Sequence, residues 1–193
     1  MKVAGLGGSL ASSSQSREAL AIGLAGAEEA GAETVLLDLR ELDLPLYSQE
    51  TEPTPTVLGM VETIASADGL LWSSPLYQGS ISGSFKNALD WLHLPSGNVY
   101  LTDKVIGLIS VAGGTQGLQA INTMEFCVRA LRAWAVPLVV PVPRGAVADE
   151  ATERQLKMLG AEVVRIGEHF VSEPEPEHEK VCTDAAVRIA AAA

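Results

Sequence analysis

The segment GLGGSLASSSQS, residues 5–16, holds the residue types best suited to binding a phosphate group. Its twelve positions contain three glycines and five serines. Glycine lets the backbone approach a ligand closely, and a serine hydroxyl donates a hydrogen bond without adding charge or much bulk. Ser9, Ser14 and Ser16 flank a turn into a helix, whose N-terminus adds free main-chain N–H groups. The serines alone leave a second interpretation open, in which they only cap the helix.

Two other kinds of nucleotide loop fit this segment less well. A triphosphate-binding P-loop needs a lysine next to a serine or threonine, and no lysine lies between Val3 and Lys86. A dinucleotide fingerprint needs a third glycine where this sequence has Leu10. Asp38 stands where such folds keep an acid for the ribose, so a Rossmann-type dinucleotide-binding protein stays open as a weaker alternative. A single phosphate monoester suits the segment best.

The elements that must position this loop alternate between strand and helix. Short apolar runs predict strands over residues 2–6, 33–39, 69–74, 104–111 and 137–142. Apolar residues at helical spacing predict helices over residues 15–30, 57–66, 82–92, 116–134 and 149–171. This alternation predicts an α/β fold in which helices cover both faces of a parallel sheet. Ligands bind such sheets beyond the carboxyl ends of the strands, so we expect the loops over residues 7–16, 38–49, 74–84 and 112–117 to surround one site.

Two of these loops have the composition of a ring-binding surface. In SPLYQGSISGSFKNALDWL, residues 74–92, Pro75 and Tyr77 predict a stiff turn with an aromatic side chain, and Gly79 and Ser80 expose main-chain N–H groups. A flat heteroaromatic ring needs an apolar face of this kind and donors at its edge. The run VAGGTQG, residues 111–117, offers glycines that can approach the same ring, although an ordinary strand-to-helix turn explains them at least as well.

The 193-residue chain is acidic, with a formal net charge of −11, and 47% of its residues are hydrophobic. This charge disfavours nucleic acid and anionic membranes as partners, so an anionic ligand needs local donors. No apolar run reaches the roughly 20 residues of a membrane span, and the N-terminus lacks the pattern of a signal peptide. The two cysteines lack the spacing of a metal site. We therefore expect a cytoplasmic protein without a bound metal.

Together these segments resemble the NADPH-dependent FMN reductases of flavodoxin-like fold, a family that includes quinone, azo-dye and chromate reductases. The resemblance covers residues 2–142 and rests on GGSLASSSQS, LDLPLY, ADGLLWSSPLYQGSISGSFKNALDWL and AGGTQG, in that order. It implies a three-layer sandwich with a five-stranded parallel sheet in the order 2-1-3-4-5 and helices on both faces. Residues 1–173 would form a flavodoxin-like FMN-binding domain, and residues 174–193 an acidic, then Ala-rich, C-terminal tail.

The resemblance also assigns roles to individual residues. Ser9, Ser14 and Ser16, with the main chain around Gln15, would hold the FMN phosphate. The isoalloxazine ring would be bound by the loops after the third and fourth strands, at Pro75, Leu76, Tyr77, Gln78, Gly79, Ser80, Gly113, Gly114 and Thr115. The family commonly has an arginine where this chain has Ala11, and the loss of that charge is expected to weaken FMN binding.

The implied function is that of an NAD(P)H oxidoreductase whose chemistry is carried by flavin N5 and not by a catalytic side chain. Electrons would pass from NADPH or NADH through FMN to free flavin, a quinone or another small-molecule acceptor. A flavin-binding electron carrier without substantial NAD(P)H turnover is the alternative. The family resemblance implies a homodimer or homotetramer, and Asp90 and Trp91 lie on a helix that can form the contact between subunits. Phe85, Leu89 and Leu92 are expected in the core.

Overall fold

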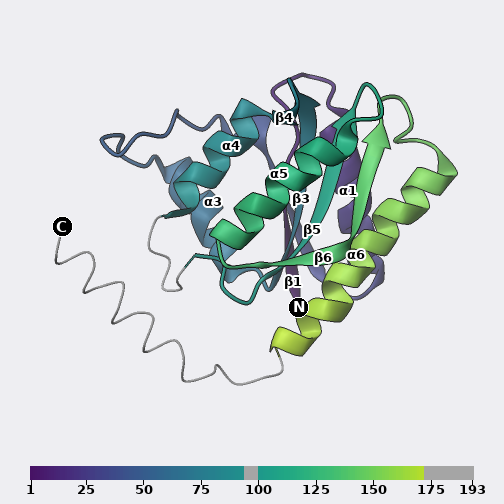
Figure 1. Ribbon diagram of the computed structural model, residues 1–193. Helices are drawn as coiled ribbons and strands as arrows, with labels where there is room; N and C mark the ends of the chain where they lie inside the picture. The colour runs from purple at the N-terminus through teal and green to yellow at the C-terminus, as the bar shows by residue number, and fades with distance from the viewer. Residues whose placement is uncertain (94–99, 172–193) are drawn as a thin grey trace.

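A parallel sheet forms the centre of the fold in the computed structural model, which describes residues 1–93 and 100–171. Its strands are β1 (Lys2–Gly7), β2 (Glu33–Asp38), β3 (Gly69–Tyr77), β5 (Val105–Ala112) and β6 (Trp134–Pro143), in the order β2-β1-β3-β5-β6 (Figure 1). A short strand, β4 (Ser80–Ile81), pairs antiparallel with the end of β3. The predicted parallel order 2-1-3-4-5 is confirmed, because β5 and β6 are the fourth and fifth predicted strands.

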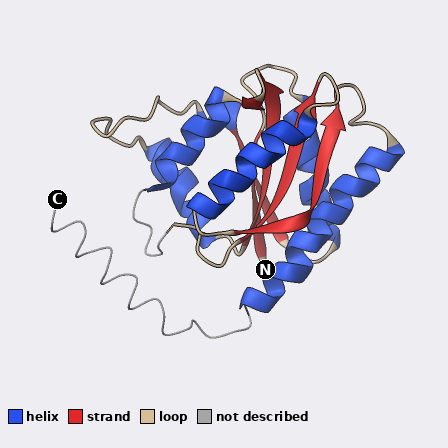
Figure 2. Cartoon of the chain, in the orientation of Figure 1, coloured by secondary structure: helices blue, strands red, loops and turns tan. Residues whose placement is uncertain are grey.

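Helices cover both faces of the sheet (Figures 1 and 2). On one face lie α1 (Gln15–Glu29) and α6 (Glu150–Val171), and on the other lie α3 (Pro55–Ser66), α4 (Gly83–Asp90) and α5 (Gly117–Ala130). A single helical turn, α2 (Leu39–Leu42), follows β2, and a 3-10 turn (Trp91–His93) follows α4. Within the described ranges, no helix combines the length and the apolar character needed to cross a bilayer.

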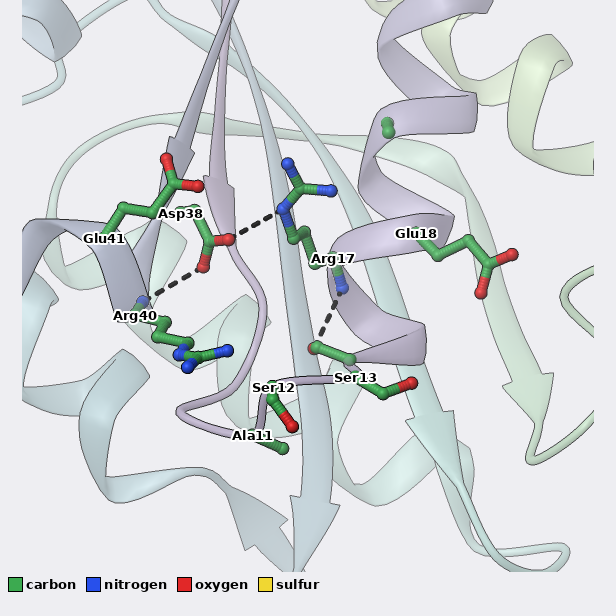
Figure 3. A pocket seen from close by; sticks show the side chains of 10 residues that line it. Ala11, Ser12, Ser13, Arg17, Glu18, Asp38, Arg40 and Glu41 are labelled. Atoms are coloured by element: carbon green, nitrogen blue, oxygen red, sulfur yellow. Dashed lines mark hydrogen bonds and ion pairs between the residues drawn. The ribbon is translucent and has the colours of Figure 1, made fainter.

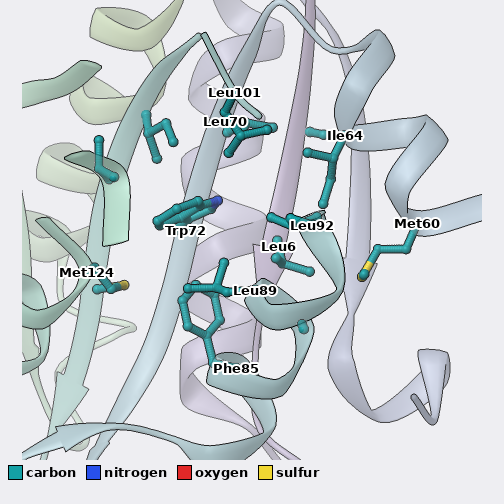
Figure 4. Close-up of a cluster of buried hydrophobic side chains, with 14 of the residues drawn as sticks. Leu6, Met60, Ile64, Leu70, Trp72, Phe85, Leu89, Leu92, Leu101 and Met124 are labelled. Atoms are coloured by element: carbon teal, nitrogen blue, oxygen red, sulfur yellow. The ribbon is translucent and has the colours of Figure 1, made fainter. Parts of the chain in front are cut away.

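The alternation of side chains along each strand gives each face its own apolar cluster. On β3, Leu71 packs in the cluster with α1 and α6, whereas Trp72 packs in the cluster with α3, α4 and α5. Trp72 meets Phe85 of α4 edge to face, with ring centroids 5.8 Å apart (Figure 4). Phe85, Leu89 and Leu92 are all buried, which confirms the prediction that they belong to the core.

Trp91 belongs to the same buried cluster, so the prediction that it contributes to a contact between subunits is wrong. Its side chain is 1% exposed, and its indole N–H donates to the Pro45 carbonyl at 3.0 Å. The ring also packs edge to face on Tyr47, with centroids 5.1 Å apart. The prediction rested on the enrichment of tryptophan in interface cores, and that enrichment does not distinguish an interface from the core of the fold.

The end of β3 differs from the sequence prediction. The strand continues through Pro75 to Tyr77, although we expected it to end at Ser74. Proline lacks an N–H donor and is tolerated only where a strand edge is free. β1 pairs with β3 only as far as Ser73, so β3 has a free edge at Pro75.

The connection between α5 and β6 also differs from the prediction. The helix ends at Ala130 instead of Trp134, and β6 begins at Trp134 instead of residue 137. Arg132 has a φ of 62°, in the left-handed region that terminates helices. The short elements α2 and β4 were not predicted, because two to four residues carry no measurable periodicity. The predicted tail, residues 174–193, lies outside the described residues.

Glycines allow α1 and α6 to approach each other closely. A Cβ on Gly160 of α6 would lie 2.0 Å from the Gly23 carbonyl oxygen of α1. A Cβ on Gly26 would lie 2.3 Å from the Lys157 carbonyl oxygen. Both distances are shorter than any side chain tolerates, so a larger residue at either position forces the helices apart. The crossing fixes α1, whose N-terminus carries Ser14 as its cap.

Gly160→Ala is therefore expected to destabilise the fold by about 1–3 kcal/mol, the usual cost of overpacking. Urea titration gives the free energy of unfolding. Gly59→Ala is the matched control, because nothing lies within 4 Å of a Cβ at this position in α3. That variant is expected to gain about 0.5–1 kcal/mol from helix propensity. Equal stability of the two variants would contradict the close packing of α1 on α6.

Candidate functional site

Four loops meet beyond the carboxyl ends of the strands, at the arrowheads in Figure 2. They follow β1, β3, β5 and β6 and enclose a cavity of about 260 Å³. The lining of this cavity, the smaller of two at this edge, comes from the loop after β1, the ends of β3 and β5, and the turns after β5 and β6: Ser9, Ala11, Ser13, Ser14, Gln15, Ser16, Pro75, Leu76, Tyr77, Val111, Gly113 and Arg144. The structure thus brings the predicted phosphate loop together with parts of both predicted ring loops.

The remaining predicted site residues lie outside this lining: Gln78, Gly79, Ser80, Gly114 and Thr115. The first three continue the hairpin between β3 and β4, and the last two lead toward α5. All of them except Ser80 are exposed. They extend the same two loops outward from the cavity.

The hydroxyl groups of the serine loop, residues 9–16, form a chain. Ser9 Oγ donates to Ser14 Oγ at 3.0 Å, and the hydroxyls of Ser14 and Ser16 lie 3.3 Å apart. Ser14 is also the N-cap of α1 and accepts from the Arg17 N–H at 3.3 Å. The capping interpretation therefore holds for Ser14. Ser9 and Ser16 are buried and present their hydroxyls beside the free N–H groups of the first helical turn.

Ser73 of β3 holds both ends of the serine loop. Its carbonyl oxygen accepts from the Gly8 N–H at 3.2 Å, and its hydroxyl donates to the Ser16 carbonyl at 2.8 Å. The first contact requires glycines, because a Cβ on Gly7 would lie 2.2 Å from the Ser73 oxygen and Gly8 has a φ of +98°. Ser73 was not among the site residues predicted from the sequence. A buried serine in an apolar strand needs a hydrogen-bond partner, and this requirement could have indicated that Ser73 holds a neighbouring loop.

Two further strand serines, both fully buried, fix the other loops. Ser110 of β5 donates to the Gly117 carbonyl at 2.7 Å, at the first residue of α5. Ser74 of β3 accepts from the Ser82 N–H at 3.0 Å, and Ser82 is the N-cap of α4. The loops after β1, β3 and β5 are therefore each tied to the sheet through a buried hydroxyl.

A larger cavity, of about 670 Å³, lies on the other side of the serine loop (Figure 3). Its charged lining residues are two arginines and three acids: Arg17, Arg40, Glu18, Asp38 and Glu41. Asp38 accepts from Arg17 Nε at 2.7 Å and from the Arg40 N–H at 3.0 Å, and it caps α2. Because the Asp38 side chain is buried and engaged in this way, it is poorly placed to bind a ribose, which disfavours the dinucleotide alternative.

The two cavities differ in charge. Among the described residues that line the smaller cavity, Arg144 alone carries a charge. In the larger cavity the acids outnumber the arginines, and Arg17 is paired with Asp38. Opposite charges attract most strongly where water is partly excluded, so an anion is favoured in the smaller cavity and disfavoured in the larger one.

The hairpin between β3 and β4 closes through two residues with positive φ. Gln78 has a φ of 48° and Gly79 a φ of 80°, between the paired residues Tyr77 and Ser80. This is the pattern of a type I′ turn, which favours Asn-Gly. The turn expected around Pro75 therefore lies at Gln78 and Gly79. Glutamine adopts the left-handed region only at an energetic cost.

Gln78→Asn is expected to stabilise the fold by up to about 1 kcal/mol, because asparagine tolerates left-handed φ values better than glutamine does. The melting temperature should rise accordingly. Gln155→Asn is the matched control, since Gln155 is an exposed residue of α6 where asparagine lowers helix propensity. If both variants melt below the parent protein, the type I′ turn is refuted.

The pKa values of half-buried Cys127 and buried Lys104 are shifted, and neither residue lines a cavity. Burial raises the pKa of the Cys127 thiol on α5, so its reactive thiolate is disfavoured. Burial lowers the pKa of Lys104, although Asp68 acts in the opposite direction. The Lys104 ammonium donates to the carbonyl of Ala65 at 2.8 Å and to that of Ala67. Both groups are part of the packing around the sheet.

Comparison with known proteins gives the chain a family. Residues 1–153 match the family model described as NADPH-dependent FMN reductase. The NADPH-dependent FMN reductase ArsH of Acidithiobacillus ferrooxidans is 35% identical over 115 residues, which are 59% of this chain and 48% of that protein. The NADPH azoreductase of a Bacillus species is 32% identical, covering 67% of this chain and 72% of that protein. The NADPH:quinone oxidoreductase of Arabidopsis thaliana is 33% identical, covering 82% of this chain and 88% of that protein.

The match therefore spans about half the length of the FMN reductase from A. ferrooxidans, and most of the length of the azoreductase and the quinone oxidoreductase.

Solved structures show the same fold at low sequence identity. RosB, with a bound 8-demethyl-8-formylriboflavin-5′-phosphate, has a TM-score of 0.78 and 16% identity, covering 97% of this chain and 87% of that one. A WrbA-like flavodoxin from Agrobacterium tumefaciens has a TM-score of 0.66 and 16% identity, covering 88% and 98%.

Proposed function

The chain belongs to the family of NADPH-dependent FMN reductases, and from this membership we propose that it is an FMN-dependent NAD(P)H oxidoreductase. It takes reducing equivalents from NADPH or NADH and passes them to a small-molecule acceptor. The observation that supports this function most directly is the lining of the smaller cavity. Serine hydroxyls, a helix N-terminus and one arginine meet there with residues of both predicted ring loops.

Ser9, Ser14 and Ser16, with the main chain at Gln15, are proposed to hold the FMN phosphate. Hydroxyls and helical N–H groups are suitable hydrogen-bond donors to a phosphate. None of the described residues that line the smaller cavity carries a carboxylate. Ser9 is 5% exposed and Ser16 is 2% exposed. Their side chains are already ordered by packing, so phosphate binding has little conformational entropy left to remove.

The isoalloxazine ring is proposed to lie along the ends of β3 and β5 and the loops that follow them. Pro75 and Leu76 offer an apolar wall, and Tyr77, which is 49% exposed, adds an aromatic surface at the edge. The main chain over residues 78–80 and 113–115 supplies donors for the ring's polar edge. A Cβ on Gly113 or Gly114 would meet nothing within 4 Å, so the space beside these residues is open to a ligand.

When bound, FMN would supply the hydride-transfer chemistry of this reaction. The residues of the chain bind the cofactor and set its orientation. Tyr77 at the end of β3 and Thr115 in the loop after β5 are both exposed, which leaves this side of the site accessible to a second planar molecule. Nicotinamide and acceptor would use this access in turn.

The acceptor is proposed to be a quinone, an azo compound or free flavin. The support comes from relatives named as a quinone oxidoreductase and an azoreductase. These acceptors are planar and largely apolar, so they can stack on the exposed side of a ring held by the two loops.

We also propose that residues 1–173 form one FMN-binding domain with residues 174–193 as its tail, and that the protein is a cytoplasmic homodimer or homotetramer. Because Trp91 is buried, the contact between subunits must use other apolar residues. Leu118 and Phe126 of α5, which are 51% and 67% exposed, lie on one helical face and suit this role. Light scattering gives the mass, and a monomer would contradict the assembly.

Purified protein mixed with FMN, NADPH and a quinone tests the function directly. NADPH consumption is expected to depend on both FMN and the quinone, and the same assay with NADH gives the donor preference. Protein that binds FMN and consumes neither nicotinamide would be an electron carrier. Protein that binds no FMN would contradict both functions.

The double substitution Ser9→Ala and Ser14→Ala is expected to weaken FMN binding by about 1–3 kcal/mol, because phosphate oxygens lose their hydroxyl donors. Titration of FMN fluorescence measures the dissociation constant. Ser12→Ala is the matched control, since Ser12 lines only the larger cavity. An unchanged dissociation constant in the double variant, or an equal loss in the control, would show that the phosphate lies elsewhere.

A further inference from the structure

We propose that Arg144 is the cationic ligand of the FMN phosphate in this chain. The inference rests on the proposed function and adds a residue that was not predicted from the sequence. Arg144 follows β6, far along the chain from the serine loop, and it lines the smaller cavity together with Ser9, Ser14 and Ser16.

The main chain around Arg144 is held between the two halves of the site. The Arg144 N–H donates to the Ala112 carbonyl at 2.7 Å, at the end of β5. The next residue, Gly145, has a φ of +89° and donates its N–H to Gln15 Oε1 at 2.9 Å. Gln15 is the first residue of α1. These two bonds place Arg144 between the loop after β5 and the helix N-terminus that faces the phosphate.

The guanidinium of Arg144 is available for a ligand. Within residues 1–93 and 100–171 it forms no ion pair or hydrogen bond. Arg17 and Arg40, the other arginines beside the serine loop, line the larger cavity instead, and Arg17 donates to Asp38 at 2.7 Å. Ala11 brings no charge to the loop. Arg144 is therefore the cation that the smaller cavity can offer.

The chemistry of a phosphate monoester fits this assignment. A formal net charge of −11 repels an anionic ligand, and hydroxyl and N–H donors alone do not cancel the ligand's charge. An arginine side chain forms charge-assisted, frequently bidentate hydrogen bonds with phosphate oxygens, about twice as strong as neutral ones. The serine hydroxyls would then fix the position of the phosphate while Arg144 neutralises it.

The test compares FMN with riboflavin, which has the same ring and no phosphate. In Arg144→Gln, the dissociation constant for FMN is expected to rise roughly ten- to a hundred-fold, as for the loss of a hydrogen bond to a charged group. The dissociation constant for riboflavin is expected to stay unchanged. Salt should weaken FMN binding by the parent protein more than binding by the variant. The bonds that hold this turn come from main-chain N–H groups, so the substitution leaves them in place.

Arg154→Gln is the matched control, because Arg154 lies on the exposed surface of α6 and pairs with Glu150 at 3.2 Å. It is expected to bind both flavins like the parent protein, and thermal melting checks that both variants fold. An unchanged FMN constant in Arg144→Gln would overturn the proposal, and so would an equal loss of FMN and riboflavin. If the parent protein itself binds no FMN, the proposed function fails, and this outcome is distinct from the other two.

Discussion

The contact between Ser73 and the serine loop is the interaction on which the site depends. One residue of the central strand accepts from Gly8 and donates to Ser16, and so it holds the beginning and the end of the loop against the sheet. The contact is possible because Gly7 has no side chain to collide with the Ser73 carbonyl. Without this closure, the hydroxyls of Ser9 and Ser16 would not share one cavity.

The same loop separates two environments of different charge. On one side, Asp38 accepts a hydrogen bond from Arg17 and caps α2, so this pair has a structural role. On the other side, buried hydroxyls and a helix N-terminus leave a cavity without acids among its described residues. In a protein that is strongly acidic overall, this local separation makes an anion-binding site possible.

The sequence predicted the fold well because strands buried on both faces are continuous apolar runs and the helices between them are periodic. It also predicted most of the cavity lining, since the loops after β1, β3 and β5 carry unusual concentrations of glycine, serine and proline. The rule that ligands bind at the carboxyl ends of parallel strands then joins these loops into one site.

The sequence did not predict Arg144 and Ser73 as site residues, because their roles depend on partners far along the chain. Nothing near Arg144 in the sequence indicates that the next residue contacts Gln15. In the sequence, nothing distinguishes Ser73 from an ordinary strand residue. Its role is visible only in its hydrogen bonds with Gly8 and Ser16. Trp91 was misplaced because the general enrichment of tryptophan in interfaces does not indicate where one side chain packs, and its contacts with Pro45 and Tyr47 are visible only in the structure.

A crystal structure of the protein with FMN tests the central claim most directly. The account predicts the phosphate in the smaller cavity, within hydrogen-bond distance of the hydroxyls of the serine loop and of Arg144, with the ring along the loops after β3 and β5. A phosphate in the larger cavity beside Arg17 and Arg40, or a ring away from residues 75–80, would contradict it.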